Sequence, residues 1–442
     1  MCSSDLQGNV TVEPGAVIDA SGVAGGNIGI AAAQGQLQIS GVIAAAAQRP
    51  SMTRTVRTPL IVADISRALA TPTRDETELV LLASINDNAA TTGIAGQGGS
   101  VQLKGFLVNA PTGLIDVAGD AGGRIGVNAL GDLVIGDGAT LSASGSKGGQ
   151  VYIESAEGKT LVSGNIFVNG DGDRGGLIRL LGEKVALLGR ARLQTRGRNG
   201  GGEVLVGGDY QGSNPGVRNA TATYIGQDAS IDASATEAGD GGKVIVWSNE
   251  ATRVYGTIQV RAGGKGGDGG FVETSGTHLD ISGLRVDATS PAGKGGLWLL
   301  DPDDIAIEAT GSEANITGSP NFTPITDFAI LSTGTIQGQL NVGTSVTVST
   351  ARAGTDSLAG NITVNAPITK SFGGDASLTL NAHNNININA SITSSTGKLD
   401  LVLNSDSDGV GGGVINLGWA TLNANGGTIS ATGKTVNVSS ST

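Results

Sequence analysis

The sequence predicts an all-β fold, a right-handed parallel β-helix with coils of about 24–28 residues. A pair of glycines followed by a short apolar run returns along the chain, and six of the eight intervals between its copies are 24–28 residues long. The pairs end at residues 26, 99, 123, 149, 176, 202, 242, 270 and 296. The 442 residues include 74 Gly but only 6 Phe, 4 Tyr and 3 Trp, a composition that suits a narrow, repetitive core. A period of this length with strands inside each unit is typical of a solenoid.

Each unit contains three short runs in which apolar and polar residues alternate. The first run follows the glycines, as in residues 151–153, and the second comes about ten residues later, as in 279–281. The third run, as in 284–288, follows a further glycine. Alternate side chains of a strand point to opposite faces, so we expect the apolar set inside and the polar set outside. The glycine pairs are expected at one corner of each coil, where a positive φ would permit a tight bend.

Changes in residue composition and in the regularity of the repeat divide the chain into five segments. Their bounds are residues 1–6, 7–43, 44–93, 94–300 and 301–442. The first segment, MCSSDL, back-translates to the end of a sequencing adapter, so we expect it to be an artefactual start. Segments 7–43 and 94–300 carry β-helix coils, and the latter is the regular glycine-pair shaft. Segment 301–442 is a looser block rich in Asn and Thr that we expect to continue the β-helix. About fourteen to sixteen coils would give a rod on the order of 70 Å long.

Residues 44–93 are predicted to be an aperiodic insertion. They have helical composition in part, and Thr73 and Glu76 have the spacing of a capping box. Three interpretations stay open: a subdomain that projects from one coil, a structureless loop, and a local frameshift in the sequence. Residues 207–221 are a shorter polar insertion with turn chemistry.

Charge and composition exclude several classes of partner. The formal net charge is −12, spread thinly, which disfavours nucleic acid and anionic membranes because both require a basic surface. No run of about 18 apolar residues occurs, so we predict no membrane insertion. Cys2 is the only cysteine, which excludes a disulfide framework and a cysteine metal site.

The glycine-rich stretches do not match known ligand loops. No Gly-Lys-Ser/Thr follows the pairs, and a strand rather than a helix comes next, which argues against nucleotide binding. Residues 263–271 approach a calcium-binding nonapeptide, but Gly270 stands where an apolar residue is required and no tandem copy follows. We therefore predict no cofactor and no metal site.

Catalytic constellations are also weak, and we predict no catalytic residue. Asp301, Asp303 and Asp304 form an acidic group, but Asp-Pro-Asp is ordinary turn chemistry. In β-helical polysaccharide lyases clustered carboxylates bind calcium while a Lys or Arg acts as base, and in the hydrolases paired aspartates do acid and base work, which keeps an enzyme as the alternative. His278 and His383 are lone histidines without partners at metal-ligand spacing.

One basic concentration stands out on this acidic chain. It consists of Arg190, Arg192, Arg196 and Arg198. Outward arginines on stacked strands could bind sulfated or sialylated glycans through bidentate contacts, so this cluster is a candidate polyanion site. The competing interpretation is a solvated surface.

Seven Asn-x-Ser/Thr sequons occur, several of them expected by chance in a chain rich in Asn and Thr. They are Asn9, Asn219, Asn315, Asn321, Asn361, Asn389 and Asn437.

The strings GGFVETSG, LDISGLRVDA and GGLWLLDPDDIAI, within residues 269–307, resemble the filamentous-haemagglutinin and high-molecular-weight adhesin family of two-partner secretion exoproteins. The resemblance covers residues 94–310 well, and 7–43 and 311–442 more loosely. It implies a secreted rod on the bacterial outer surface that attaches to glycans or proteins of host or bacterial surfaces. It also implies export through an outer-membrane pore-forming transporter partner, with no enzyme chemistry and no cofactor.

The sequence departs from this family in one respect. The NPNG-type motifs of the family's N-terminal secretion domain are absent, and the nearest string, residues 214–216, lies in a different place. Two alternatives to an adhesin shaft stay open: a β-helical polysaccharide lyase or hydrolase, and the delivery stalk of a contact-dependent toxin.

Overall fold

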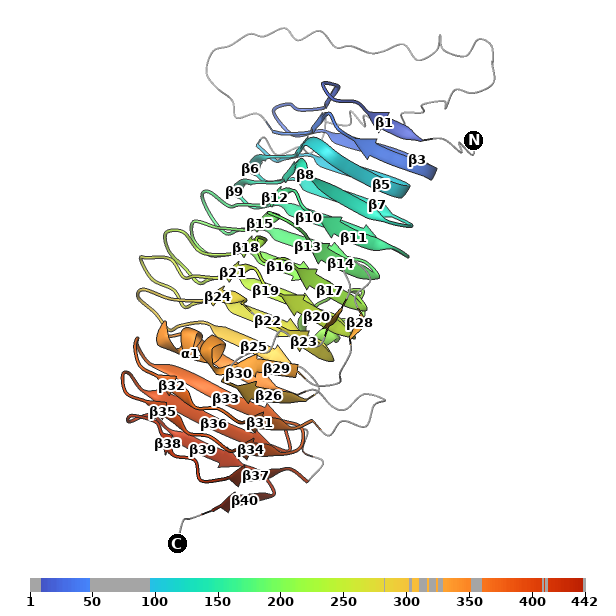
Figure 1. The fold of residues 1–442 in the computed structure, drawn as a ribbon. Coiled ribbons are helices and arrows are strands. Elements are labelled where there is room, and N and C mark those ends of the chain that lie inside the picture. Colours follow the sequence, from blue (N-terminus) through green and yellow to red (C-terminus); the bar gives the residue numbers. More distant parts are fainter. Residues whose placement is uncertain are drawn as a thin grey trace, which may run out of the picture.

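The computed structural model is a rod of stacked β-coils that runs from the N-terminal end to the C-terminal end of the chain (Figure 1). It describes residues 9–47, 96–281, 283–301, 304–309, 316–317, 323–324, 329–350, 360–407, 409 and 412–439. The predicted parallel β-helix is confirmed, with about 12 coils of about 27 residues. The coils are fewer than the fourteen to sixteen expected because long intervals count as single coils. Ser100 donates its backbone N–H directly to the carbonyl of Gly26, for example, across 73 residues of sequence between the two glycine pairs.

Each coil has three faces, and the first face follows the glycine pair. Its strands pair in parallel from one coil to the next. They are β3 (Asn27–Ile39), β5 (Ser100–Asp116), β7 (Arg124–Ala129), β10 (Gln150–Ser155), β13 (Leu177–Leu181), β16 (Glu203–Val206), β19 (Lys243–Trp247), β22 (Phe271–Ser275), β25 (Leu297–Asp301), β30 (Ser345–Ser349), β33 (Ala376–Ala382), β36 (Leu399–Ser405) and β39 (Ile429–Thr432).

The second face begins after a bend, and the long strands β3 and β5 run on into it. Its other strands are β1 (Val10–Val12), β8 (Leu133–Ser142), β11 (Lys159–Val162), β14 (Lys184–Leu187), β17 (Ala222–Ile225), β20 (Ala251–Val254), β23 (His278–Asp280), β29 (Ala329–Ser332), β26 (Ile305–Glu308), β31 (Ile362–Val364), β34 (Ile386–Ile388), β37 (Val414–Leu417) and β40 (Thr435–Val438).

The third face closes the coil, and the ends of β5 and β8 belong to it. Its other strands are β2 (Val17–Asp19), β4 (Val42–Ala44), β12 (Asn165–Phe167), β15 (Arg192–Gln194), β18 (Ser230–Asp232), β21 (Thr257–Gln259), β24 (Arg285–Asp287), β32 (Ile368–Lys370), β35 (Ile392–Ser394) and β38 (Leu422–Asn423). Two short pairs lie outside the faces: β6 (Gly119–Ala121) with β9 (Gly145–Lys147), and β27 (Ile316–Thr317) with β28 (Thr323–Pro324).

The core is a set of columns of inward-facing side chains. Along the first face, one column contributes one residue from each of the ten strands from β7 to β36, and each of these residues is fully buried. It contains Ile125, Val151, Ile178, Val204, Val244, Val272, Trp298, Val346, Leu378 and Leu401. Because identical positions stack directly, each coil buries its apolar residues only against its neighbours, as in other solenoids.

The glycine pairs lie at one corner of each coil as predicted, but the predicted reason is wrong. None of the paired glycines has a positive φ; that conformation occurs at other glycines, such as Gly239 and Gly276. The pairs are needed because the backbones of successive coils approach closely there. A Cβ added at Gly270 would overlap the carbonyl oxygen of Gly242, and one at Gly269 would overlap the carbonyl oxygen of Ala288.

Side-chain oxygens at the bends link each coil to the next. The carboxylates of Asp132, Asp375 and Asp400 each accept the backbone N–H of a residue one coil further on. In the C-terminal block asparagines form a ladder, in which the amide of Asn416 donates to Asn387 and the amide of Asn437 donates to Asn416. The aspartates satisfy backbone N–H groups that the bends would otherwise leave unpaired, whereas the asparagine ladder joins side chains of neighbouring strands.

One coil is irregular, at the junction where the sequence changes texture. Strand β26 precedes β29 in the chain, but β29 lies between β23 and β26 in space, so the two strands stack in the reverse of their sequence order. Helix α1 (Thr333–Asn341) follows β29 and lies against β32 of the third face. Helix α1 is therefore an exception to the all-β fold predicted from the sequence. Ser332 caps α1 by accepting the N–H of Gly334, which is ordinary helix-start chemistry.

Lys370 is a buried charge in the inward row of β32. Its side chain is fully buried, and its Nζ donates to the carbonyl oxygens of Phe372 and Thr396 at 2.6 Å and of Gly373 at 3.2 Å. In the next coil Ser394 occupies the paired position and donates to the carbonyl of Gly397 at 2.9 Å. An ammonium group that satisfies three carbonyls is accommodated in a core, because each proton has an acceptor.

The first residues of the predicted insertion at 44–93 can be compared with the structure. Residues 44–47 still belong to a coil, because Ala44 pairs with Asp116 and Ala47 bridges to Gly22. Residues 48–93 and the start at 1–6 lie outside the described residues.

Replacing Gly270 with alanine is expected to destabilise the rod by about 1–3 kcal/mol, because the new methyl group must push two coils apart. The matched control is Gly264→Ala, since Gly264 has open space around its Cβ position and should tolerate the change within about 0.5 kcal/mol. Urea midpoints of the two variants check this. Equal midpoints would refute the close-approach explanation.

Replacing Lys370 with methionine should cost about 2 kcal/mol, because three carbonyls lose a charged donor while the apolar volume is kept. Lys398 is exposed, so Lys398→Met serves as the control and should leave the melting temperature nearly unchanged. A Lys370→Met protein as stable as the parent would show that the carbonyl cage contributes nothing.

Candidate functional site

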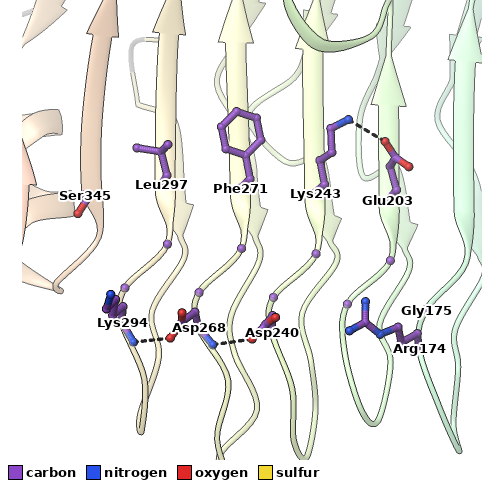
Figure 2. Close-up of a pocket in the computed structure, with 18 of the residues that line it drawn as sticks. Arg174, Gly175, Glu203, Asp240, Lys243, Asp268, Phe271, Lys294, Leu297 and Ser345 are labelled. Carbon is purple, nitrogen blue, oxygen red and sulfur yellow. Dashed lines mark hydrogen bonds and ion pairs between the residues drawn. The ribbon is translucent and has the colours of Figure 1, made fainter. Parts of the chain in front are cut away.

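The glycine corner forms the floor of an open groove that runs along the rod (Figure 2). This groove has a volume of about 850 Å³ and crosses the coils of β13, β16, β19, β22 and β25. A second groove of about 490 Å³ lies over the same corner on the preceding coils. The two adjoin, because Gln150 lines one, Leu177 lines the other, and these residues pair directly.

Two rows of side chains form the walls. The leading row consists of the residues just before each glycine pair, and its members in the grooves are Ala24, Gln97, Ala121, Lys147, Arg174, Asp240, Asp268 and Lys294. The trailing row consists of the residues just after each pair: Asn27, Ser100, Arg124, Gln150, Leu177, Glu203, Lys243, Phe271 and Leu297. Figure 2 shows the two rows facing each other across the glycines. A groove with small floor residues and exposed polar walls can hold an extended chain.

The charges of the C-terminal part of the groove are largely satisfied within the protein. Lys243 Nζ lies 3.0 Å from Glu203 Oε1 and 3.4 Å from Asp209 Oδ1. Burial opposes the charge of Lys243, but these two carboxylates outweigh it and raise the pKa of its ammonium group. Asp240 accepts the backbone N–H of Asp268, and Asp268 accepts that of Lys294, each at 2.8 Å (Figure 2). These carboxylates therefore serve to connect coils.

Residues 207–221, named here the strap, cover part of the outer surface of the first face. The outward row Leu205, Ile245, Glu273 and Leu299 is buried although it does not point into the core. The strap contains the 3-10 turn η2 (Tyr210–Gly212), whose Gln211 donates its backbone N–H to Glu273 Oε1 at 3.1 Å. The prediction that outward-facing strand residues are polar is wrong here, because the strap packs over this part of the face as a second layer.

The strap also brings an aromatic ring to the groove. Tyr210 is 41% exposed, and its ring centroid lies 5.9 Å from that of Phe271 in the trailing row. Asp209 fixes the turn by accepting the N–H of Tyr210 at 2.7 Å. Burial raises the pKa of Asp209, but hydrogen bonds from Asn214 and Tyr210 and the charge of Lys243 outweigh it, so the pKa is lowered.

The two distinctive strings of the sequence have structural roles. In FVETSG, Glu273 is fully buried and accepts from Gln211 and from the hydroxyl of Ser275. In LWLLDP, Trp298 is fully buried, and its Nε1 donates to Thr274 Oγ1 of the preceding coil at 3.0 Å. The strings therefore join neighbouring coils and hold the strap.

The four arginines singled out from the sequence lie around β15: Arg190 precedes it, Arg192 begins it, and Arg196 and Arg198 follow it. Arg190 and Arg192 are exposed. Arg196 forms an ion pair with Asp232 at 2.7 Å, and Arg198 forms one with Glu237 of the next coil. Hydrogen bonds from Arg198 and Lys265 lower the pKa of Glu237 to about 2. Two of the four guanidinium groups are thus engaged in coil-to-coil pairs.

The other residues weighed in the sequence lie apart from the groove or serve the fold. Asp304 accepts the backbone N–H of Asn361, whereas Asp303 and the side chain of Asp301 lie outside the described residues. His278 lies in β23, and His383 follows β33. Within the described residues no group of three or more His, Cys, Asp or Glu side chains is placed to hold a metal ion.

Three sequons use their amide nitrogen inside the fold. Asn219 donates Nδ2 to the carbonyl of Gly212, and Asn389 donates to Asn365. Asn437 donates to Asn416. Modification at these positions would break the bond. Asn9 and Asn361 instead accept backbone N–H groups, and Asn315 and Asn321 lie outside the described residues.

A cluster of half-buried polar groups surrounds the buried Arg253 on the second face. Tyr255 Oη donates to Asp280 Oδ2 at 2.6 Å, and the rings of Tyr224 and Tyr255 meet edge to face. Burial, together with Asp280, raises the pKa of Tyr255. Burial lowers the pKa of Arg253, which is nearly inaccessible between the same groups. Neither groove is lined by these residues, so the cluster stabilises the face.

The groove itself was not predicted from the sequence. The signal was present: aligning the chain on its glycine pairs places the leading and trailing residues in two columns, and stacked columns become rows on one surface. The strap's contact with Glu273 had no such signal, since 62 residues separate the partners.

Comparisons with known proteins find likeness among solved structures but not among family models or curated sequences. No protein-family model matches the sequence, and no curated protein sequence matches it. The crystal structure of the HMW1 secretion domain from Haemophilus influenzae is similar at 22% identity with a TM-score of 0.41, over 66% of this chain and 78% of that chain. No helix in the described part of the chain is long and apolar enough to cross a membrane.

Removing the strap's anchor with Glu273→Ala should free residues 207–221, because the Gln211 amide and the Ser275 hydroxyl lose their acceptor. We expect a loss of about 1–3 kcal/mol, since two donors lose a fully buried acceptor. Hydrogen exchange of residues 207–221 measures the release, with the exposed Glu250→Ala as control. Unchanged protection of the strap in Glu273→Ala would contradict the assignment.

Proposed function

We propose that this chain is part of the shaft of a large secreted bacterial adhesin, a rigid rod that presents binding surfaces for attachment to cells or other surfaces. One observation carries the proposal: the molecule repeats one coil along its length and displays a continuous two-walled groove on that repeat. A repeated surface can engage a ligand many times weakly, and such multivalent contacts add up to firm attachment.

The family resemblance of the strings in residues 269–307 supports the same function. Those strings lie where the last regular coils meet the strap and the irregular coil. They therefore correspond to specific contacts of this rod and not only to its general repeat. The resemblance extends the proposal to a position on the bacterial outer surface and to export through an outer-membrane pore-forming transporter. The ligands proposed are glycans or proteins of host or bacterial surfaces.

An enzyme is the competing proposal, and the use of the carboxylates argues against it. Asp240 and Asp268 accept backbone amides, and Glu203 is paired with Lys243. General acid and base catalysis needs carboxyl groups free to exchange protons with a substrate. We therefore propose a binding rod without catalytic residues or a cofactor.

The test combines attachment and turnover. Beads coated with the folded chain should attach to cultured cells or to bacteria in a saturable way, while beads coated with the heat-unfolded chain should not. Incubation of the same protein with pectin or alginate should release no reducing ends. Attachment equal to that of the unfolded control would overturn the adhesin proposal, and measured turnover would favour a lyase or hydrolase.

A further inference from the structure

The N-terminal part of the groove is positively charged, in contrast to the chain as a whole. Arg124, Lys147 and Arg174 come from three successive coils, and no carboxylate lines the adjoining groove of about 490 Å³. None of the three forms an ion pair with any residue that the structure describes. With coils about 4.8 Å apart, Lys147 and Arg174 follow each other along the leading wall, and Arg124 lies on the trailing wall across the glycines.

The first of these cations is held in place by an aromatic ring. The guanidinium carbon of Arg124 lies 4.6 Å from the ring centroid of Tyr152, and that of Arg179 lies 5.3 Å from the same centroid. Tyr152 Oη donates to Gln150 Oε1 at 3.1 Å. A stacked guanidinium loses less freedom when it binds a ligand, because its position is already fixed.

Carboxylates do occur nearby, and they set the limits of this surface. Asp171 and Asp173 are exposed in the loop before Arg174, outside the residues that line either groove. Towards the C-terminal end the walls acquire Glu203 and Asp240. The positive stretch is therefore confined to the coils of β7, β10 and β13.

The floor of the groove cannot accept a peptide strand. Gly122 donates its N–H to the carbonyl of Lys147 at 2.8 Å, and Gly148 donates to that of Arg174 at 3.0 Å. Strand addition needs free main-chain donors and acceptors, and here the coils use them on each other. A ligand in this groove therefore finds these main-chain donors already used and is expected to contact mainly the side chains of the walls. Besides the cations, the walls offer neutral hydrogen-bonding groups: Asn27, Gln97, Ser100 and Gln150.

We infer that this stretch of the groove binds an extended acidic polysaccharide, with its carboxylate or sulfate groups at Arg124, Lys147 and Arg174 and its hydroxyl groups at the neutral wall residues. Arginine binds such groups through paired N–H donors, and lysine acts as a point charge. The inference rests on the proposed function, for which it names a ligand chemistry and a place. It differs from the candidate cluster at Arg190, Arg192, Arg196 and Arg198, where two arginines are already paired.

The experiment measures binding by the full chain with isothermal titration calorimetry. The probes are a size-defined oligogalacturonate, a heparin oligosaccharide and a poly-glutamate peptide of matched charge. The test variant combines Arg124→Gln, Lys147→Gln and Arg174→Gln. The control combines Arg190→Gln, Arg192→Gln and Lys398→Gln, which removes the same charge from exposed positions elsewhere. Single Lys147→Gln is measured as well, because this exposed side chain is the least able to affect folding.

We expect at least one oligosaccharide to bind, with affinity that falls as NaCl is raised. The test variant should bind about tenfold or more weakly, and the control should stay within about twofold of the parent. Binding of oligogalacturonate alone would identify carboxylates as the recognised groups, and binding of heparin alone would identify sulfates.

Three outcomes would overturn the inference: equal loss in both variants, loss in the control alone, or binding of the peptide as tight as that of the oligosaccharides. Bead attachment separates this inference from the proposed function. If beads coated with the test variant still attach while no oligosaccharide binds, the rod is an adhesin and the groove is not its polysaccharide site. If oligosaccharides bind but no beads attach, the groove assignment stands and the adhesin proposal fails.

Discussion

The close parallel contact between successive coils at the glycine corner is the constraint on which the rest of this molecule depends. There the residue after each pair donates its backbone N–H to the second glycine of the coil before, as Phe271 does to Gly242 at 2.9 Å. No side chain fits between these backbones. The stacking fixes the register of all three faces, and the register then places identical positions above one another. Core columns, polar rungs and the walls of the groove all follow from that one contact.

The polar side chains of this protein mostly serve the same stacking. Asp268, Glu273 and Lys370 would each attract attention as functional residues in a globular enzyme, yet each satisfies backbone groups of a neighbouring coil or of the strap. Buried polar groups of this kind cost free energy unless they are paired, and they therefore specify one arrangement. The groups left for a ligand are those on the walls of the groove, above all the positive stretch near its N-terminal end.

The fold class followed from the sequence because a solenoid repeats its signals. Period, alternation and the glycine pairs all pointed to one answer, and the structure agrees with it. The physical reason given for the glycines was wrong because sequence cannot distinguish a bend from a close approach. The helix after Ser332 and the exchange of β26 and β29 each occur once among the described residues, so no repeat period could predict them. The strap's docking on Glu273 depends on a contact between distant segments, which a repeat pattern cannot reveal.

Native-state hydrogen exchange tests the central claim most directly, because it reports each backbone amide separately. If the coils are held together at the glycine corner, the amides of residues such as Arg124, Leu177 and Phe271 should be among the slowest to exchange. Protection should then recur with a period of about 27 residues. Fast exchange at these amides, with protection elsewhere or without a period, would contradict the account.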